Sequence, residues 1–148
     1  MDYSKITEEL FIGTTPAASD YDLLRSLDVG MVINMRLERR HFPDLDAHPL
    51  NFLWLPTIDW PLCPIPIAML KRGTRRALET IQAGKRVFAH CAGGRHRGVA
   101  MGAAILIARG YSAPDAMQLI SARRQTADPQ VFYIRSRILR FARQWQAG

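Results

Sequence analysis

The sequence predicts an α/β fold: a central, mostly parallel sheet of about 4–5 strands flanked by helices. Two observations support this prediction. Short apolar runs alternate with stretches of helical periodicity, as in chains that build a parallel sheet with covering helices. The chain has 148 residues, of which 48% are hydrophobic and 22% are charged, and this composition is typical of a globular chain. We therefore expect a single domain over residues 1–148.

The first part of the chain is predicted to form strands around one short helix. Residues 6–12 suit two short strand pieces on either side of a polar turn, and residues 31–35 and 51–55 suit further strands. Ser19 has an acid three positions later, a layout that begins a helix. Gly30 is the expected left-handed residue beyond the end of that helix.

Prolines and glycines mark the expected boundaries in the rest of the chain. Pro56 is expected to end the strand before it, and the four prolines from there to Pro66 exclude regular structure. Pro66 suits the first turn of a helix that Gly84 closes. Ser112 and Asp128 are each expected to cap a further helix.

Charge is distributed unevenly along the chain. Residues 1–65 carry 5 Lys and Arg against 10 Asp and Glu, whereas residues 66–148 carry 15 against 3. A basic half can bind nucleic acid, an anionic membrane surface or a phosphorylated ligand. The sequence has no zinc-finger spacing and no RNA-binding aromatic motif, so we expect no nucleic-acid partner. The start of the chain lacks a signal-peptide layout, so we expect a cytoplasmic protein. We also expect a monomer.

The segment from residue 87 to residue 108 has the strongest functional signal. Residues 87–89 suit a buried strand, and an apolar helix is expected to begin at Gly98. The glycine-containing loop between them carries Cys91 and, six positions later, Arg97. Backbone amides and the helix dipole both favour an anion at a helix N-terminus. The sequence therefore predicts a thiolate nucleophile beside a bound, phosphate-sized anion.

Residues 90–97, His-Cys-Ala-Gly-Gly-Arg-His-Arg, resemble the His-Cys-x-x-Gly-x-x-Arg signature of cysteine-dependent protein tyrosine phosphatases. The short length and the order of the motifs look like the dual-specificity branch of that superfamily. Residues 10–13 and 30–35 resemble strand segments of the same family, so the resemblance covers most of the chain. It implies a dual-specificity phosphatase-like fold and a phosphomonoester hydrolase that needs no metal and no cofactor.

The resemblance and the chemistry of the side chains together assign roles. Cys91 would attack phosphorus in line as a thiolate and form a cysteinyl-phosphate. Arg97 would hold two phosphate oxygens with its planar fork. Asp59, 32 residues before Cys91, matches the place of the family's general acid and base, although Asp44 and Asp46 are nearby acids. The residues expected to bind phosphate are Ala92, Gly93, Gly94, Arg95, His96 and Arg97.

Two residues near this chemistry are expected to support it indirectly. His90 should be buried and hydrogen-bonded, so that it props the loop and does not carry a proton. Cys63 is expected to be structural, with a protective disulfide to Cys91 as the alternative.

The loop also departs from the family pattern. The family usually has Ser or Thr after the Arg, and its hydroxyl helps the sulfur leave the phosphoenzyme. Gly98 stands there in this chain, so we hypothesise slow dephosphorylation. Arg95 and His96 are additional cations, and they resemble the pocket of family members that act on highly anionic substrates. Arg95 pointing outward is the alternative.

Three functions stay open at this stage. The first is a phosphatase acting on a protein phosphorylated at Tyr, Ser or Thr, or on a phosphoinositide or inositol phosphate. Contact with a membrane surface is compatible with this function. The second is a phosphate-binding module with little turnover because of Gly98. The third is another thiolate enzyme, such as a sulfurtransferase or an arsenate reductase.

Overall fold

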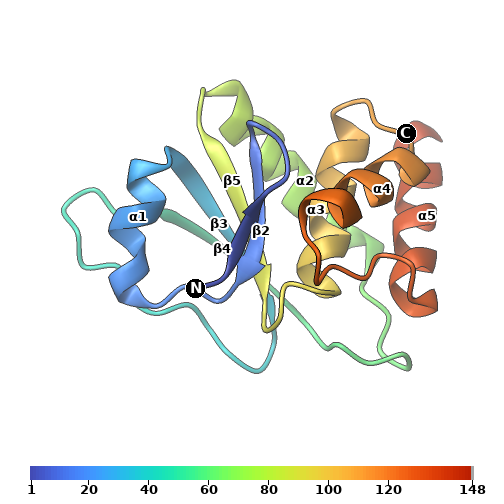
Figure 1. Ribbon diagram of the computed structural model, residues 1–148, viewed down its shortest axis with the longest axis horizontal. Coiled ribbons are helices and arrows are strands. Elements are labelled where there is room, and N and C mark those ends of the chain that lie inside the picture. The colour runs from blue at the N-terminus through green and yellow to red at the C-terminus, as the bar shows by residue number, and fades with distance from the viewer. Residues whose placement is uncertain (148) are drawn as a thin grey trace.

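The computed structural model describes residues 1–147 and is built on one five-stranded sheet (Figure 1). The strands lie side by side in the order β1-β2-β5-β3-β4. β1 pairs antiparallel with β2, and all other neighbours are parallel, so the predicted mostly parallel sheet is confirmed. The strands are β1 (Tyr3–Lys5), β2 (Leu10–Thr14), β3 (Val29–Arg36), β4 (Asn51–Thr57) and β5 (Arg86–Cys91).

Helices cover both faces of the sheet and are distributed unequally between them. α1 lies on one face, where Tyr21 and Leu24 pack with Phe11 and Phe88 from the strands. The other four α-helices gather on the opposite face (Figure 1). The helical elements are η1 (Ala18–Asp20), α1 (Tyr21–Ser26), α2 (Ile67–Gln82), α3 (Arg97–Ala108), α4 (Ala113–Arg123) and α5 (Phe132–Ala147).

α3 is the central helix of the larger layer. It is buried from Arg97 to Ile107, because it packs on the sheet with one side and on α2, α4 and α5 with the others. Small side chains such as Ala100, Ala103 and Ala104 allow this close packing. The N-terminus of α3 is thereby fixed directly beyond the end of β5. No helix in the described part of the chain is long and apolar enough to cross a membrane.

The structure corrects the expected ends of the first helix. α1 begins at Tyr21, and Asp20 is the residue that precedes it, so Ser19 does not cap this helix. The carboxylate of Asp20 accepts a hydrogen bond from the Ala17 amide. Gly30 lies inside β3 and not at a helix end. The left-handed position is taken by Asp28, with φ of 64°. Asp tolerates this conformation better than most residues because its short polar side chain can bond locally.

Two further boundaries also differ from the expectation. Pro56 lies within β4 and does not end it. This is possible because β4 is an edge strand and its register with β3 shifts beside Pro56, so the missing amide hydrogen costs no ladder bond. The last helix begins at Phe132, whereas Asp128 lies in the loop before it and donates its amide to the carbonyl of Arg95 at 2.9 Å. Ser112 does cap α4, by accepting from the Asp115 amide.

Candidate active site

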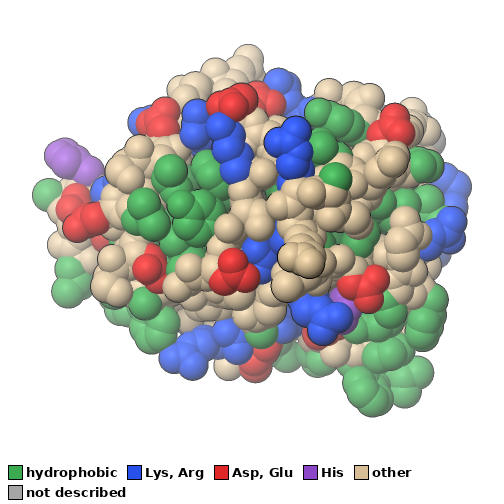
Figure 2. Space-filling view, in the orientation of Figure 1, with side chains coloured by type: hydrophobic (Ala, Val, Ile, Leu, Met, Phe, Trp, Pro, Cys, Tyr) green, Lys and Arg blue, Asp and Glu red, His purple; other side chains and the backbone are tan. Residues whose placement is uncertain are grey.

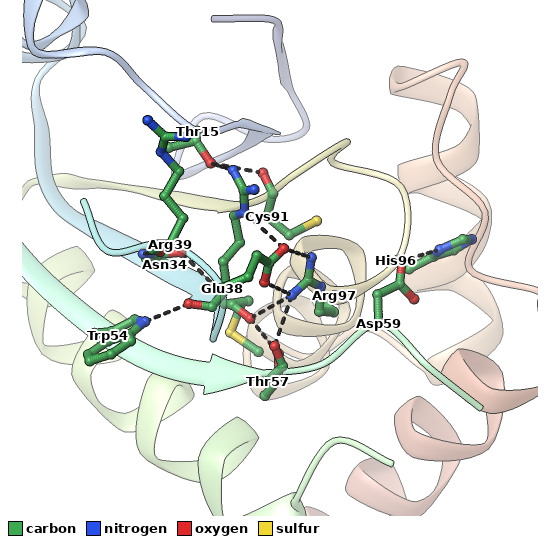
Figure 3. A network of polar contacts seen from close by, with 12 residues as sticks. Thr15, Asn34, Glu38, Arg39, Trp54, Thr57, Asp59, Cys91, His96 and Arg97 are labelled. Carbon is green, nitrogen blue, oxygen red and sulfur yellow. Dashed lines mark hydrogen bonds and ion pairs between the residues drawn. The ribbon is translucent and has the colours of Figure 1, made fainter. Parts of the chain in front are cut away.

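The predicted site residues meet at the carboxyl end of the parallel strands (Figure 3). Cys91 is the last residue of β5 and Arg97 is the first residue of α3, and both are buried. Asp59 follows β4 by two residues. Figure 3 shows Arg97 between Glu38 on one side and Asp59 on the other. Segments distant in sequence therefore converge on the loop of residues 92–96, which we call the phosphate loop.

Arg97 is fixed by acceptors that the sequence did not reveal. Its Nη1 and Nη2 donate to the two carboxylate oxygens of Glu38 at 2.8 and 3.0 Å, and Nη1 also donates to the carbonyl of Thr57 at 2.9 Å. Its buried Nε–H has no hydrogen-bond partner among the described residues. The edge of the guanidinium formed by Nε and Nη2 is thus left to bind an anion, in the parallel geometry that suits two phosphate oxygens.

The charges around Arg97 also bear on protonation. Burial alone would lower the pKa of Arg97, but the hydrogen bonds that Arg97 donates to Glu38 and the electrostatic interactions with Cys91, Glu38 and Asp59 raise it. The same ion pair lowers the pKa of Glu38 from 4.5 to about 2, although burial of the carboxylate works in the opposite direction. Arg97 is therefore a permanent cation at the N-terminus of α3, beside the Cys91 thiol.

Arg124 is a second buried cation, and it supports the phosphate loop from the outside. It is 2% exposed, and its guanidinium donates to the carbonyls of Gly94 at 2.8 Å and Gly93 at 3.2 Å. Arg124 also donates hydrogen bonds to the hydroxyl of Ser4 and to the carboxylate of Asp2. Arg124 therefore supplies hydrogen-bond donors to two carbonyls of the phosphate loop.

Gly94 is required by this arrangement. It has φ of +62°, in the left-handed region that favours glycine. A Cβ at Gly94 would lie 2.6 Å from Arg124 Nη2 and 2.9 Å from the carbonyl oxygen of Gly13. Any side chain at this position would push Arg124 away from the loop.

Asp59 is held by two donors from different parts of the chain. Its Oδ1 accepts from the Tyr133 hydroxyl at 2.6 Å, and its Oδ2 lies 3.0 Å from His96 Nδ1. Burial would raise the pKa of Asp59, but the hydrogen bonds from Tyr133 and His96 and the charges of His96 and Arg97 outweigh this and lower it. The other ring nitrogen of His96 lies 3.7 Å from Asp128.

The supporting residues are placed only partly as expected. His90 is fully buried as predicted. Neither ring nitrogen has a hydrogen-bond partner among the described residues, so the prediction that His90 supports the loop through hydrogen bonds was wrong. Burial lowers the pKa of His90 to about 3 and keeps the ring neutral. Cys63 is exposed and Cys91 is buried, and both are free thiols, so the alternative disulfide is not formed.

Several residues of the phosphate loop are exposed to solvent. Ala92 and Gly93 are exposed, and the amides of the loop precede the N-terminus of α3. The Arg95 side chain is also exposed and donates to the carbonyl of Thr126 at 3.3 Å, which fits the outward alternative. A Cβ at Gly98 would lie 3.3 Å from the carbonyl carbon of His90 and 3.4 Å from the Cys91 nitrogen. Glycine at this position thus lets α3 approach the end of β5 closely.

No family model and no curated protein matches the chain by sequence. Solved structures match it closely in fold. Human DUSP28, a dual-specificity phosphatase, is 23% identical over 97% of this chain and 98% of its own, with a TM-score of 0.85. PTPMT1 in complex with PI(5)P is 23% identical over 98% and 97%, with a TM-score of 0.83. The human tyrosine phosphatase-like serine/threonine/tyrosine-interacting protein is 19% identical over 97% of both chains, with a TM-score of 0.82.

These structures align with nearly all of this chain and with nearly all of their own. The resemblance inferred from residues 90–97 therefore extends to the arrangement of the whole domain. This chain has the fold of the dual-specificity phosphatases.

Proposed function

We propose that the protein is a cysteine-dependent phosphomonoester hydrolase of the dual-specificity type. The observation that carries this proposal is the unpaired, buried Nε–H of Arg97, beside a buried Cys91 thiol at the N-terminus of α3. Arg97 and the loop amides supply the positive potential that a metal ion supplies in other phosphatases. This arrangement supports the metal-independent chemistry that the sequence predicts.

The first chemical step is transfer of the phosphoryl group to sulfur. The Cys91 thiolate attacks phosphorus, an S–P bond forms and the P–O bond to the leaving group breaks. The leaving oxygen takes a proton from Asp59. The fork of Arg97 and the loop amides bind the phosphoryl oxygens through the transition state.

The second step regenerates the thiolate. Asp59, now ionised, takes a proton from a water molecule whose oxygen attacks phosphorus. The S–P bond breaks, the electron pair returns to Cys91 and inorganic phosphate is released. Asp59 is then protonated again, ready for another substrate.

Hydrolysis of p-nitrophenyl phosphate tests this proposal. The wild-type protein should release p-nitrophenol, and Cys91→Ser should release none above background. Cys63→Ser is the matched control because Cys63 is exposed and free, and it should retain the wild-type rate. Equal activity in Cys91→Ser and wild type would overturn the proposal.

We further propose two candidate substrate classes, a phosphorylated protein and a phosphoinositide or related lipid phosphate. The second is favoured by large apolar side chains near Asp59, since Trp60 is 54% exposed, Leu62 81% and Phe132 71%. Figure 2 shows apolar side chains gathered at the lower right, where Figure 1 places the loop after β4 and the start of α5. PTPMT1, which has the same fold, is known in complex with PI(5)P.

A panel of phosphotyrosine, phosphoserine and phosphothreonine peptides and phosphoinositide vesicles separates these classes. The lipid class predicts a higher kcat/KM on vesicles than on any peptide, and the protein class predicts the reverse. Cys91→Ser serves as the inactive control for every substrate.

A phosphate-binding protein with little turnover is the alternative function. It is favoured by Gly98, and the fold is shared with a tyrosine phosphatase-like interacting protein. Gly98→Ser restores the hydroxyl but also adds a Cβ, which is crowded against residues 90 and 91. Gly98→Ala adds the same Cβ without the hydroxyl and is the matched control. If the hydroxyl is the missing element, Gly98→Ser should hydrolyse the phosphoenzyme faster than Gly98→Ala does.

A further inference from the structure

The carboxylate of Asp59 is held by two elements at the same time. Tyr133, in the first turn of α5, occupies Oδ1 at 2.6 Å, and His96, in the phosphate loop, occupies Oδ2 at 3.0 Å. The Tyr133 hydroxyl and His96 Nδ1 are themselves 3.4 Å apart. The three side chains form a closed cluster at the mouth of the candidate site.

This cluster is the main polar connection between the acid-bearing segment and the rest of the site. Residues 58–64 have no regular structure, and their remaining hydrogen bonds are local, from Trp60 to Ile58 and from Cys63 to Trp60. Farther along the same stretch, the carbonyl of Ile65 accepts from Arg137 Nε in α5 at 2.9 Å. Among the described residues, only Tyr133 and His96 form hydrogen bonds with the side chain of Asp59. The position of the Asp59 carboxylate therefore depends on these two donors.

We propose that Tyr133 and His96 are positioning residues that hold Asp59 at the phosphate loop before the substrate binds. The inference rests on the proposed phosphatase function and adds two residues to it. A carboxylate already in place needs no loop closure to reach the leaving oxygen, and such preorganisation is what proton transfer in a transition state requires.

The same two contacts also set the protonation of the acid. Both donors bind the ionised carboxylate and favour it over the protonated form. The groups that face the cluster are Asp128, 3.7 Å from His96 Nε2, and the cation Arg97. Removing the Tyr133 hydroxyl weakens the preference for the ionised form. Asp59 should then keep its proton to a higher pH, while its position becomes less fixed.

Esters with different leaving groups provide the test. p-Nitrophenoxide leaves readily without a proton, whereas phenoxide and alkoxides need one, so only the second group depends strongly on Asp59. Tyr133→Phe should lower kcat/KM for phenyl phosphate about tenfold more than for p-nitrophenyl phosphate. The fall of kcat/KM at high pH should shift to a higher pH in this variant. Tyr111→Phe, the same change in the turn between α3 and α4, should leave both the ratio and the profile unchanged.

His96 allows a conservative rescue. Asn can place an amide donor near the position of the imidazole Nδ1, so His96→Asn should retain more activity on phenyl phosphate than His96→Ala does. Equal losses on both esters in Tyr133→Phe, with an unshifted pH profile, would overturn the inference in favour of a structural role. An unchanged ratio in both Tyr133→Phe and His96→Ala would also overturn it.

Hydrogen exchange separates this inference from the proposed function. The hydrogen-bonded amides of Trp60 and Cys63 should exchange faster in Tyr133→Phe than in wild type or Tyr111→Phe, whether or not the protein hydrolyses any ester. If wild type hydrolyses neither ester but the exchange rates differ as expected, the proposed function fails and the positioning contacts stand. If the exchange rates are the same, the inference fails.

Discussion

The two sides of the candidate site are built in different ways. On one side, Arg97 and Arg124 are buried cations with three or more acceptors each, and Arg124 holds two carbonyls of the phosphate loop. On the other side, Asp59 lies on an irregular segment and is held by two side-chain hydrogen bonds near the surface. In the proposed function, anion binding is therefore coupled to the stability of the fold, whereas proton donation depends on contacts that contribute little to that stability.

The largest effect on stability is expected on the buried side, at Arg124. Arg124→Met leaves the carbonyls of Gly93 and Gly94 and the carboxylate of Asp2 without their donor. Breaking such a buried set should lower the free energy of unfolding by about 3–5 kcal/mol. Urea unfolding measures this, with the exposed neighbour in Arg123→Met as the control, expected within about 0.5 kcal/mol of wild type. Similar losses in both variants would contradict a special role for Arg124.

The reverse pattern is expected on the exposed side, at Asp59. Asp59→Asn keeps the shape of the side chain but cannot donate or retrieve the proton. The kcat/KM for phenyl phosphate should fall by about 10²-fold or more. The free energy of unfolding should change by less than about 0.5 kcal/mol, because the segment is exposed and irregular. Asp46→Asn, which replaces an alternative acid, should leave kcat/KM unchanged. A larger loss of kcat/KM in Asp46→Asn than in Asp59→Asn would identify Asp46 as the general acid.

The ion pair between Glu38 and Arg97 should give the buried side a pH dependence. The pKa of Glu38 falls from 4.5 to about 2 on folding, so its stabilisation is present above pH 4.5 and is lost as the pH falls towards 2. The Glu38 side chain is about half exposed, so solvent screening limits the effect to about 1 kcal/mol or less. Denaturant midpoints between pH 5 and 2.5 should fall less steeply in Glu38→Gln than in wild type. Parallel profiles would show that the ion pair does not contribute.

The smallest effect on stability is expected at Leu62, on the exposed side of the candidate site. Leu62 is 81% exposed, so Leu62→Ser removes almost no packing and should change the free energy of unfolding by less than about 0.5 kcal/mol. Thermal unfolding of the variant checks this. A clear destabilisation would show that the segment around Asp59 is packed more tightly than its exposure indicates.

Local sequence patterns were sufficient for the centre of the site. A strand, a glycine-containing loop and a helix are adjacent in the chain, so the positions of Cys91 and Arg97 followed from one short segment. The prediction for Asp59 came from its spacing to Cys91 in the family that the loop resembles, and the structure places its carboxylate beside His96 of the phosphate loop. Alternating strands and helices predicted the mostly parallel sheet, but not its strand order or the antiparallel β1.

The residues that sequence reasoning missed act over long separations. Glu38 is 59 residues from Arg97, Arg124 is 30 residues from Gly94, and Tyr133 is 74 residues from Asp59. Each has its partner in a distant element, so no local pattern distinguishes it. For Glu38 a signal did exist, since an acid just beyond β3 must lie at the same sheet edge as Cys91.

The boundaries that were wrong have physical reasons of the same kind. Pro56 fits inside a strand only because β4 is at the sheet edge, and strand order is not a local property. Asp128 resembles a helix cap, but its amide and carboxylate face the phosphate loop. The tertiary contact decides the conformation at both positions.

The most direct test of the account is the chemical state of Cys91 during turnover. The protein is mixed with p-nitrophenyl phosphate, quenched in acid within milliseconds and digested for mass spectrometry. We predict one phosphoryl group on the peptide that contains Cys91, formed together with p-nitrophenol and absent in Cys91→Ser. Release of p-nitrophenol without a phosphorylated Cys91, or with the phosphoryl group on another residue, would contradict it.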